Sequence, residues 1–259
     1  MSQSERLSQV FLKSEELVRR LVDGSSITKE DIVLEIGPGK GIITEKLLQK
    51  SKGVIAVEKD PNLARSLQQR YQGMPNIEII NTDILRYRLP QFPYKVFSNI
   101  PFAIEGQLIR TFLNAPSGLE DGYLFMRREY AMRFAGKSRE SQFHITYGPW
   151  FDLEIFRSLR KEDFQPRPMV ETDILRFRKK EEPLLDVKDK PLFESFVTQG
   201  YGNGSTFRQS LNGLLSRNQM IRLAQDFGFN IHNKPTDLLL NQWIGMFKFY
   251  RSFTGFRPR

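Results

Sequence analysis

The sequence predicts an α/β protein with a doubly wound parallel sheet, helices on both faces of that sheet, and a small all-helical region after it. The first half of the chain alternates short apolar runs with amphipathic stretches of helical period. This alternation is typical of strand–helix–strand units that bury a parallel sheet between helices. Polar residues follow several of the runs, at the strand ends where such sheets bind ligands. The expected strands are 32–36, 53–58, 76–80 and 95–98, and the expected helices between them are 41–50 and 60–71.

The chain divides into two expected domains. Its 259 residues suffice for a main domain with a smaller appendage. The charged segment 176–183 ends in a proline after the last expected strand, 172–177, and indicates a boundary. We therefore expect a main domain over residues 1–180 and a helical C-terminal domain over residues 181–259. Four helices are expected in the second domain, over 193–200, 206–215, 219–227 and 236–249.

The composition points to a polyanionic partner and away from metal or disulfide chemistry. The 39 Lys and Arg residues outnumber the 30 Asp and Glu residues and give a net charge of +9. This favours a nucleic-acid partner, although a solvated basic surface is the alternative. The chain has no cysteine and two histidines, so we expect neither disulfides nor a metal site. Signal-like, membrane-spanning and coiled-coil patterns are absent, which predicts a cytoplasmic, monomeric protein without a membrane span.

The segment 32–45 joins an apolar run to a glycine-dense turn and then to a helical pattern. Gly37, Gly39 and Gly41 fall within this turn, and glycines allow a sharp turn and a close backbone approach to a ligand. The spacing lacks the third glycine position of the dinucleotide-binding signature, and a purely structural turn is an alternative. The segment therefore predicts a ligand-binding loop between a strand and a helix.

Two acids strengthen this prediction. Glu58 ends the apolar run 53–58, about 20 residues after the loop, where doubly wound sheets carry the carboxylate that accepts ribose hydroxyls. Asp83 ends the run 77–83 and provides an acceptor for the amine of an adenine ring. The loop and the two acids together resemble the S-adenosylmethionine site of Rossmann-like methyltransferases. The resemblance implies a Rossmann-like methyltransferase sheet and S-adenosylmethionine as the cofactor.

A polar–apolar–proline–aromatic tetrad, Asn99-Ile100-Pro101-Phe102, follows the fourth expected strand. Such tetrads are known from methyltransferases that act on amino groups of nucleobases. The exocyclic nitrogen of adenine is a weak nucleophile because the ring delocalises its lone pair. If Asn99 Oδ1 and the Ile100 carbonyl accept its two N–H groups, the nitrogen is aimed at the methyl group, while Phe102 stacks on the base. An Asn-capped helix with an ordinary core phenylalanine is the alternative.

These motifs resemble the rRNA adenine dimethyltransferase superfamily. Within it they resemble the Erm methyltransferases, which modify an adenine of 23S rRNA and confer resistance to macrolides, lincosamides and streptogramin B. The similarity covers nearly the whole chain. Segment 8–11, Ser-Gln-Val-Phe, resembles the family's S-Q-N-F with valine in place of asparagine, and segment 164–170 resembles its F-x-P-x-P-x-V. The loop 35–41, the two acids and the tetrad in its N-I-P-[YF] form also match the family.

The resemblance implies an enzyme that transfers methyl from S-adenosylmethionine to the 6-amino group of one adenine in 23S rRNA, with residues 1–180 as its catalytic domain. It also implies that Phe164 faces the adenine opposite Phe102, so that two rings enclose a base extruded from its stack. The alternative interpretation is that the prolines of segment 164–170 only shape the path of the chain across the sheet edge before the expected strand 172–177. The implied catalytic residues are Asn99, Ile100, Pro101, Phe102 and Phe164. The implied cofactor contacts are Gln9, Val10, Leu12, Gly37, Gly39, Glu58, Asp83, Ile84 and Asn99.

Two other functions stay open from the sequence. One is the same chemistry on adjacent adenines of small-subunit rRNA. The housekeeping enzymes of that class usually carry N-L-P-Y, so Ile100 and the short C-terminal domain argue against it. The other is a nucleic-acid-binding relative that has lost catalysis, against which the presence of Asn99, Glu58 and Asp83 argues.

Overall fold

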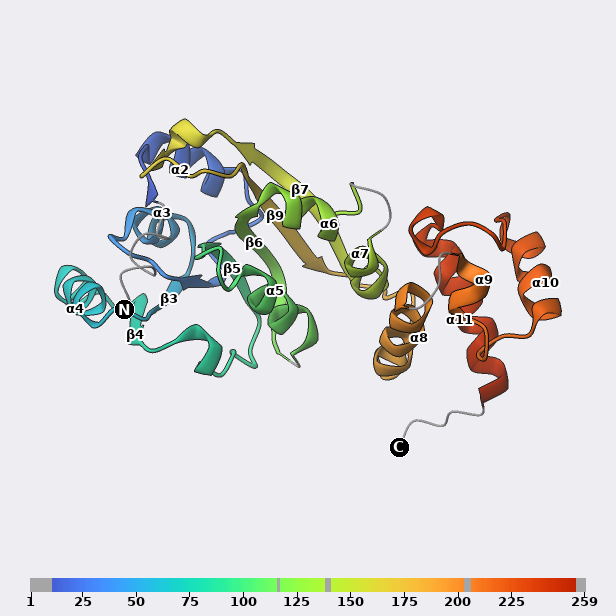
Figure 1. The fold of residues 1–259 in the computed structure, drawn as a ribbon. Helices are drawn as coiled ribbons and strands as arrows, with labels where there is room; N and C mark the ends of the chain where they lie inside the picture. The colour runs from blue at the N-terminus through green and yellow to red at the C-terminus, as the bar shows by residue number, and fades with distance from the viewer. Residues whose placement is uncertain (1–10, 116, 138–140, 203–205, 255–259) are drawn as a thin grey trace. The chain divides into compact units, whose positions relative to one another are not determined.

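The computed structural model describes residues 11–115, 117–137, 141–202 and 206–254 (Figure 1). The chain forms two compact units, and each is described by itself. Unit 1 comprises Met1–Ala131 and Glu154–Lys179, and unit 2 comprises Met132–Leu153 and Lys180–Arg259. The apolar runs of the first half of the sequence therefore lie in unit 1.

A seven-stranded sheet with the order β4-β3-β2-β5-β6-β9-β7 forms the centre of unit 1. The strands from β2 to β6 pair in parallel, and β9 pairs antiparallel to β6. The chain moves outward from β2 to β4 and returns on the other side of β2 with β5, so the winding reverses between β2 and β5. The strands are β2 (Ile32–Ile36), β3 (Gly53–Glu58), β4 (Ile77–Asn81), β5 (Tyr94–Asn99), β6 (Leu119–Arg127), β7 (Phe151–Leu159) and β9 (Thr172–Lys179). A separate antiparallel pair joins β1 (Phe11–Leu12) to β8 (Phe164–Gln165).

Helices cover both faces of this sheet (Figure 1). On one face an apolar cluster joins sheet residues such as Val33, Val54 and Tyr123 to the helices α2 to α4. On the other face α5 covers the sheet, where the ring of Phe112 stacks on Phe177 with 5.8 Å between centroids. Since side chains alternate between faces along a strand, both faces of the central strands β2, β3 and β5 are apolar. This arrangement confirms the predicted α/β class. The helices are α2 (Glu15–Asp23), α3 (Ile42–Lys50), α4 (Pro61–Arg70) and α5 (Glu105–Asn114).

Unit 2 is helical around an aromatic core. Trp243 is fully buried, and Gly200 packs so closely on it that a Cβ there would lie 2.3 Å from the indole ring. The helix expected over 206–215 ends at Ser210, because the chain takes a left-handed conformation at Gly213 (φ +101°). The helices that follow β6 are α6 (Arg128–Phe134), α7 (Gln142–Tyr147), α8 (Lys190–Gly202), α9 (Phe207–Ser210), α10 (Arg217–Phe227) and α11 (Leu240–Thr254).

Candidate active site

The glycine loop connects the end of β2 to the start of α3. Gly37, Gly39 and Gly41 all have positive φ, at +63°, +59° and +83°. Among the described residues, a Cβ on Gly37 would meet no atom within 4 Å, whereas a Cβ on Gly41 would lie 3.0 Å from Leu67 of α4. Gly41 therefore serves helix packing, while the backbone at Gly37 borders open space that a ligand can approach closely.

Glu58 ties the end of β3 to this loop. Its carboxylate accepts the Gly39 N–H at 3.1 Å and the Asp60 N–H at 2.8 Å, and the residue is 2% exposed. Burial raises the pKa of the Glu58 carboxyl, and the two N–H groups offset part of that rise. A carboxylate has about four acceptor sites, so these N–H groups leave acceptor capacity for a hydroxyl donor.

Asp83 begins the 3₁₀ turn η1 (Ile84–Arg86), which follows β4. Its Oδ1 accepts the Leu85 N–H at 3.0 Å, and the Lys59 ammonium lies 3.3 Å from its Oδ2. The Leu85 N–H bond is the main cause that lowers the pKa of Asp83, so its carboxylate is ionised. Ile84 is buried beside it. The sequence did not indicate a role for Lys59.

Glu35 is a buried acid on β2, directly before the loop. It is 1% exposed, and its Oε2 has no hydrogen-bond partner within the described residues. Burial raises the pKa of Glu35 to about 8, the neighbouring Glu58 charge adds to the rise, and Thr44 offsets only part of it. An unpartnered carboxyl oxygen beside the glycine loop fits a polar ligand at this edge of the sheet.

The tetrad lies next to the loop because β5 is the neighbour of β2. Ser98 Oγ accepts the Ile36 N–H at 2.9 Å and donates to the Ile36 carbonyl at 2.5 Å, so it bridges the ends of the two strands. Asn99 is the last residue of β5 and is half-buried. Ile100 is 3% exposed, whereas Phe102 is half-buried, with its ring on a turn that leads into α5. The fold thus brings the tetrad and the glycine loop to the same edge.

An ion pair that the sequence did not indicate fixes the start of α5. Glu105 is fully buried and accepts the backbone N–H of Arg127 at 2.9 Å as well as the Arg127 Nε–H. Burial raises the pKa of Glu105, and these two donors offset part of the rise. The Arg127 guanidinium also lies over the ring of Tyr130, 4.7 Å from its centroid. The end of β6 is therefore held to the helix that follows the tetrad.

The remaining predicted site residues fall into two groups. Gln9 and Val10 lie outside the described residues. Leu12 and Phe164 are paired across the β1–β8 ladder, and both belong to the apolar cluster beneath α2. Phe164 is fully buried, so its ring contacts the core, and its role as a stacking partner of an adenine stays a prediction.

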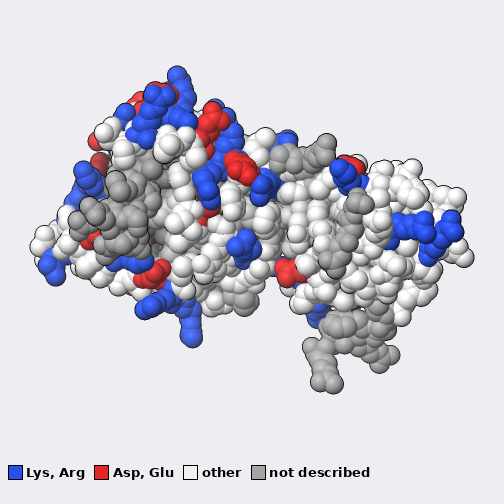
Figure 2. All heavy atoms as spheres, viewed as in Figure 1, with Lys and Arg blue, Asp and Glu red and all other residues white. Residues whose placement is uncertain are grey.

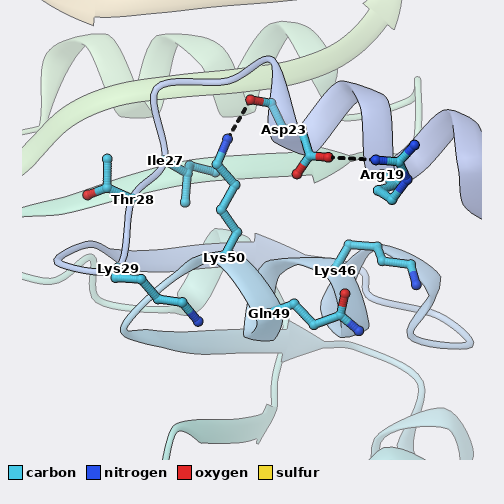
Figure 3. Close-up of a pocket in the computed structure, with 8 residues that line it drawn as sticks. All are labelled: Arg19, Asp23, Ile27, Thr28, Lys29, Lys46, Gln49 and Lys50. Atoms are coloured by element: carbon cyan, nitrogen blue, oxygen red, sulfur yellow. Dashed lines mark hydrogen bonds and ion pairs between the residues drawn. The ribbon is translucent and has the colours of Figure 1, made fainter.

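A pocket between α2 and α3 is separate from this edge (Figure 3). The Lys50 ammonium donates to the carbonyls of Val22, Asp23 and Ser25, at 2.7, 2.6 and 3.2 Å. Arg19 pairs with the Asp23 carboxylate at 3.2 Å. Lys50 thus hydrogen-bonds to carbonyls at and after the C-terminal end of α2, and Arg19 is ion-paired, which favours a structural role for this pocket.

Metal and membrane features are absent from the described residues. No group of three or more His, Asp or Glu side chains there could hold a metal ion. Within the same ranges, no helix is both long and apolar enough to cross a bilayer.

Comparison with known proteins identifies relatives along nearly the whole chain. The profile of the family described as "Ribosomal RNA adenine dimethylase" matches residues 2–252. An "rRNA adenine N-6-methyltransferase" of Bacillus licheniformis is 31% identical over 241 residues, which cover 92% of this chain and 84% of the relative. A "Probable ribosomal RNA small subunit methyltransferase A" of Methanosarcina barkeri is 32% identical over 219 residues, which cover 83% of this chain and 74% of the relative.

The solved structure of the 23S rRNA methyltransferase ErmE has the same fold. It matches with a TM-score of 0.84 at 28% identity, over 92% of this chain and 98% of that chain. Together with the family match, this confirms the resemblance to rRNA adenine methyltransferases, and the chain is an enzyme that uses S-adenosylmethionine. The open space at Gly37, the unpartnered Glu35 oxygen and the free acceptor sites of Glu58 fit that cofactor. The chain belongs to the ribosomal RNA adenine dimethylase family.

Proposed function

We propose that the enzyme methylates the 6-amino group of one adenine in 23S rRNA and thereby confers resistance to macrolides, lincosamides and streptogramin B. The likeness to the 23S rRNA methyltransferase ErmE, over almost the full length of both chains, carries the proposal. The net charge of +9 supports a polyanionic substrate, and Lys and Arg side chains occur across the face drawn in Figure 2. In this proposal the enzyme acts as a cytoplasmic monomer.

Residues of unit 1 hold the cofactor in this proposal. S-adenosylmethionine supplies a methyl group that its sulfonium makes electrophilic. Gly37 and Gly39 let the backbone lie against the ligand, and Glu58 accepts the ribose hydroxyls with the acceptor sites that its N–H partners leave free. Asp83 accepts the adenine amine of the cofactor. The other contacts that we assign to it are Gln9, Val10, Leu12, Ile84 and Asn99.

Asn99 and the Ile100 carbonyl orient the target nitrogen. Each accepts one N–H of the adenine amine, which directs the nitrogen lone pair at the methyl group and stabilises the positive charge that develops on the nitrogen. Phe102 stacks on the base, which is worth about 1–3 kcal/mol, and Pro101 shapes the turn between them. No general base is needed, because the cationic product loses its proton to water. Phe164 remains the proposed second stacking ring, and its side chain is fully buried in the apolar cluster of this structure.

A second candidate is the same reaction on small-subunit rRNA. It is favoured by the 32% identity to the Methanosarcina barkeri relative, whose name specifies the small subunit. The residues that bind the cofactor and aim the amine are the same in both candidates. The RNA target therefore has to be determined by experiment on both RNAs.

Primer extension on rRNA from a macrolide-susceptible strain that expresses the protein tests the proposal. A stop in 23S rRNA, together with macrolide resistance, is the expected result. A stop only in small-subunit rRNA supports the second candidate. No stop in either RNA, together with an unchanged mass of the corresponding oligonucleotides, contradicts both, and the Asn99→Ala variant provides the control for stops that do not depend on the enzyme. Mass measurement of the modified oligonucleotide counts the methyl groups.

A further inference from the structure

We propose that unit 2 contains a pocket for a backbone phosphate of the substrate RNA, built by Arg208, Arg217 and His232. This inference rests on the proposed function, because it takes RNA as the substrate. The pocket has a volume of about 440 Å³ and lies between α9, α10 and the loop that follows α10. Its lining residues are Thr206, Arg208, Gln209, Asn212, Arg217, Met220 and His232.

The charge of the pocket favours an anion. No acidic side chain lines it, and within the described residues neither Arg208 nor Arg217 forms an ion pair. By contrast, Arg222 of the same helix α10 is paired with Asp226 at 3.7 Å. Two guanidinium groups that border one cavity repel each other, and a bound anion relieves that repulsion. Figure 2 shows Lys and Arg side chains gathered over the α9–α10 part of unit 2.

The framework of the pocket is fixed by backbone hydrogen bonds. The Phe207 N–H donates to the Asn233 carbonyl at 2.8 Å, and the Arg208 N–H donates to the Ile231 carbonyl at 3.1 Å. These bonds hold α9 against the loop on both sides of His232. Phe207 is fully buried with its ring against Trp243, so α9 is anchored in the core of unit 2. The cationic side chains therefore extend from a rigid base.

The chemistry of the lining matches a nucleotide unit of an RNA strand. Guanidinium groups form forked hydrogen bonds with phosphate oxygens. The imidazole and the amide of Asn212 provide further polar groups, and the buried Met220 gives an adaptable apolar floor on which a ribose can rest. Arg217, Asn212 and His232 are exposed, so a strand can continue past the pocket in both directions. The cavity is larger than one phosphate needs and is within the range of small-ligand sites.

The pocket between α2 and α3 provides a contrast (Figure 3). There Lys50 donates to three carbonyl groups, and Arg19 and Lys46 face the carboxylates of Asp23 and Glu15. An anion would have to break these interactions. Arg208 and Arg217, which form no ion pair within the described part of the chain, impose no such cost, and they are therefore the better phosphate site.

The test compares the full-length wild type with the double variant Arg208→Gln/Arg217→Gln. Arg222→Gln is the matched control, because it removes one cation from α10 outside the pocket. We measure the affinity for 23S and small-subunit rRNA transcripts over a series of salt concentrations, and the steady-state constants for methylation. The double variant should bind the substrate RNA about tenfold more weakly, and its slope of log K against log salt should fall by about 1 for each phosphate that the protein no longer neutralises. KM for RNA should rise while kcat stays unchanged.

Three outcomes would overturn the proposal that this pocket binds RNA phosphate. In the first, the double variant binds RNA with the same affinity as Arg222→Gln. In the second, the double variant loses kcat without a change in RNA affinity, and in the third, inorganic phosphate binds in the pocket while the double variant keeps the wild-type affinity for RNA. His232→Gln provides a second variant for the case in which the double variant fails to fold. Failure of the proposed function is a separate result. If the wild-type protein methylates neither RNA, the double variant can still bind RNA more weakly than the wild type, and the pocket then remains supported.

Discussion

Replacing Glu35 by glutamine should stabilise the cofactor-free enzyme near neutral pH. The carboxyl is 1% exposed and its Oε2 has no partner within the described residues, so folding removes it from water without full compensation. Glutamine keeps the shape of the side chain and carries no charge at any pH. The variant therefore removes the pH-dependent cost of burying the acid and leaves the packing nearly unchanged.

The size of the effect follows from the pKa of Glu35. Burial raises this pKa from an ordinary 4.5 to about 8. The folded state then binds more protons than the unfolded state between these values, so its stability is greatest below pH 4.5 and falls as the pH rises towards 8. At about 1.4 kcal/mol for each pH unit, the full loss is about 5 kcal/mol, of which about 3 kcal/mol is reached at pH 7.

Urea unfolding of the cofactor-free protein across this pH range measures the effect. The free energy of unfolding of Glu35→Gln minus that of the wild type should grow by several kcal/mol as the pH rises, and the subtraction removes the titration of other groups. Glu78→Gln on β4 is the matched control, because it makes the same substitution at an exposed acid of the same sheet. If the Glu35→Gln difference did not grow beyond that of the control, the acid would not be buried in its neutral form and the reasoning would fail.

The remaining predictions concern the reaction. Glu58→Ala should weaken S-adenosylmethionine binding by about 1.5–3 kcal/mol, because two ribose hydroxyls lose a charged acceptor; an unchanged calorimetric affinity would contradict this. Asn99→Ala should lower single-turnover methylation while RNA binding stays near wild type. Phe102→Ala should lower both, whereas Phe102→Tyr keeps the π face and should be nearly neutral. Glu105→Gln weakens the pair with Arg127 and should lower kcat and stability but not cofactor affinity; an unchanged kcat would show that the pair only stabilises the fold.

Local signals made the sheet and the glycine loop predictable. The apolar runs that became β2, β3 and β5 are buried on both faces, so their hydrophobicity is continuous and visible in the sequence. The turn at Gly37 needs positive φ, which only glycine adopts without strain. The acids Glu58 and Asp83 were found because parallel strands end at one edge, and a residue at a strand end is recognisable from the strand alone.

Features that depend on packing were not predictable in this way. The strand β7 (Phe151–Leu159) alternates apolar and charged residues, a pattern of a half-buried strand that was not assigned. The bond between Glu105 and Arg127 joins residues that are 22 positions apart, and only the docking of α5 against β6 brings them together. Likewise, the sequence of segment 164–170 does not reveal that Phe164 lies inside the apolar cluster, because the β1–β8 pairing determines this.

The reversal of winding between β2 and β5 explains why this fold suits methyl transfer between two bulky molecules. The loop after β2 leads to α3 on one face of the sheet, and the turn after β5 leads to α5 on the other, so the two segments diverge from adjacent strands. Ser98 bridges the two strand ends beyond their last ladder pair, Leu34–Val96, through its two bonds with Ile36. The residue that holds the strands together therefore directly precedes Asn99, which contacts the substrate amine in our proposal. In our proposal a change at Ser98 would move the acceptor of the amine relative to the glycine loop, and since methyl transfer depends on the distance between nitrogen and methyl carbon, we expect such a change to slow the reaction although Ser98 itself contacts neither molecule.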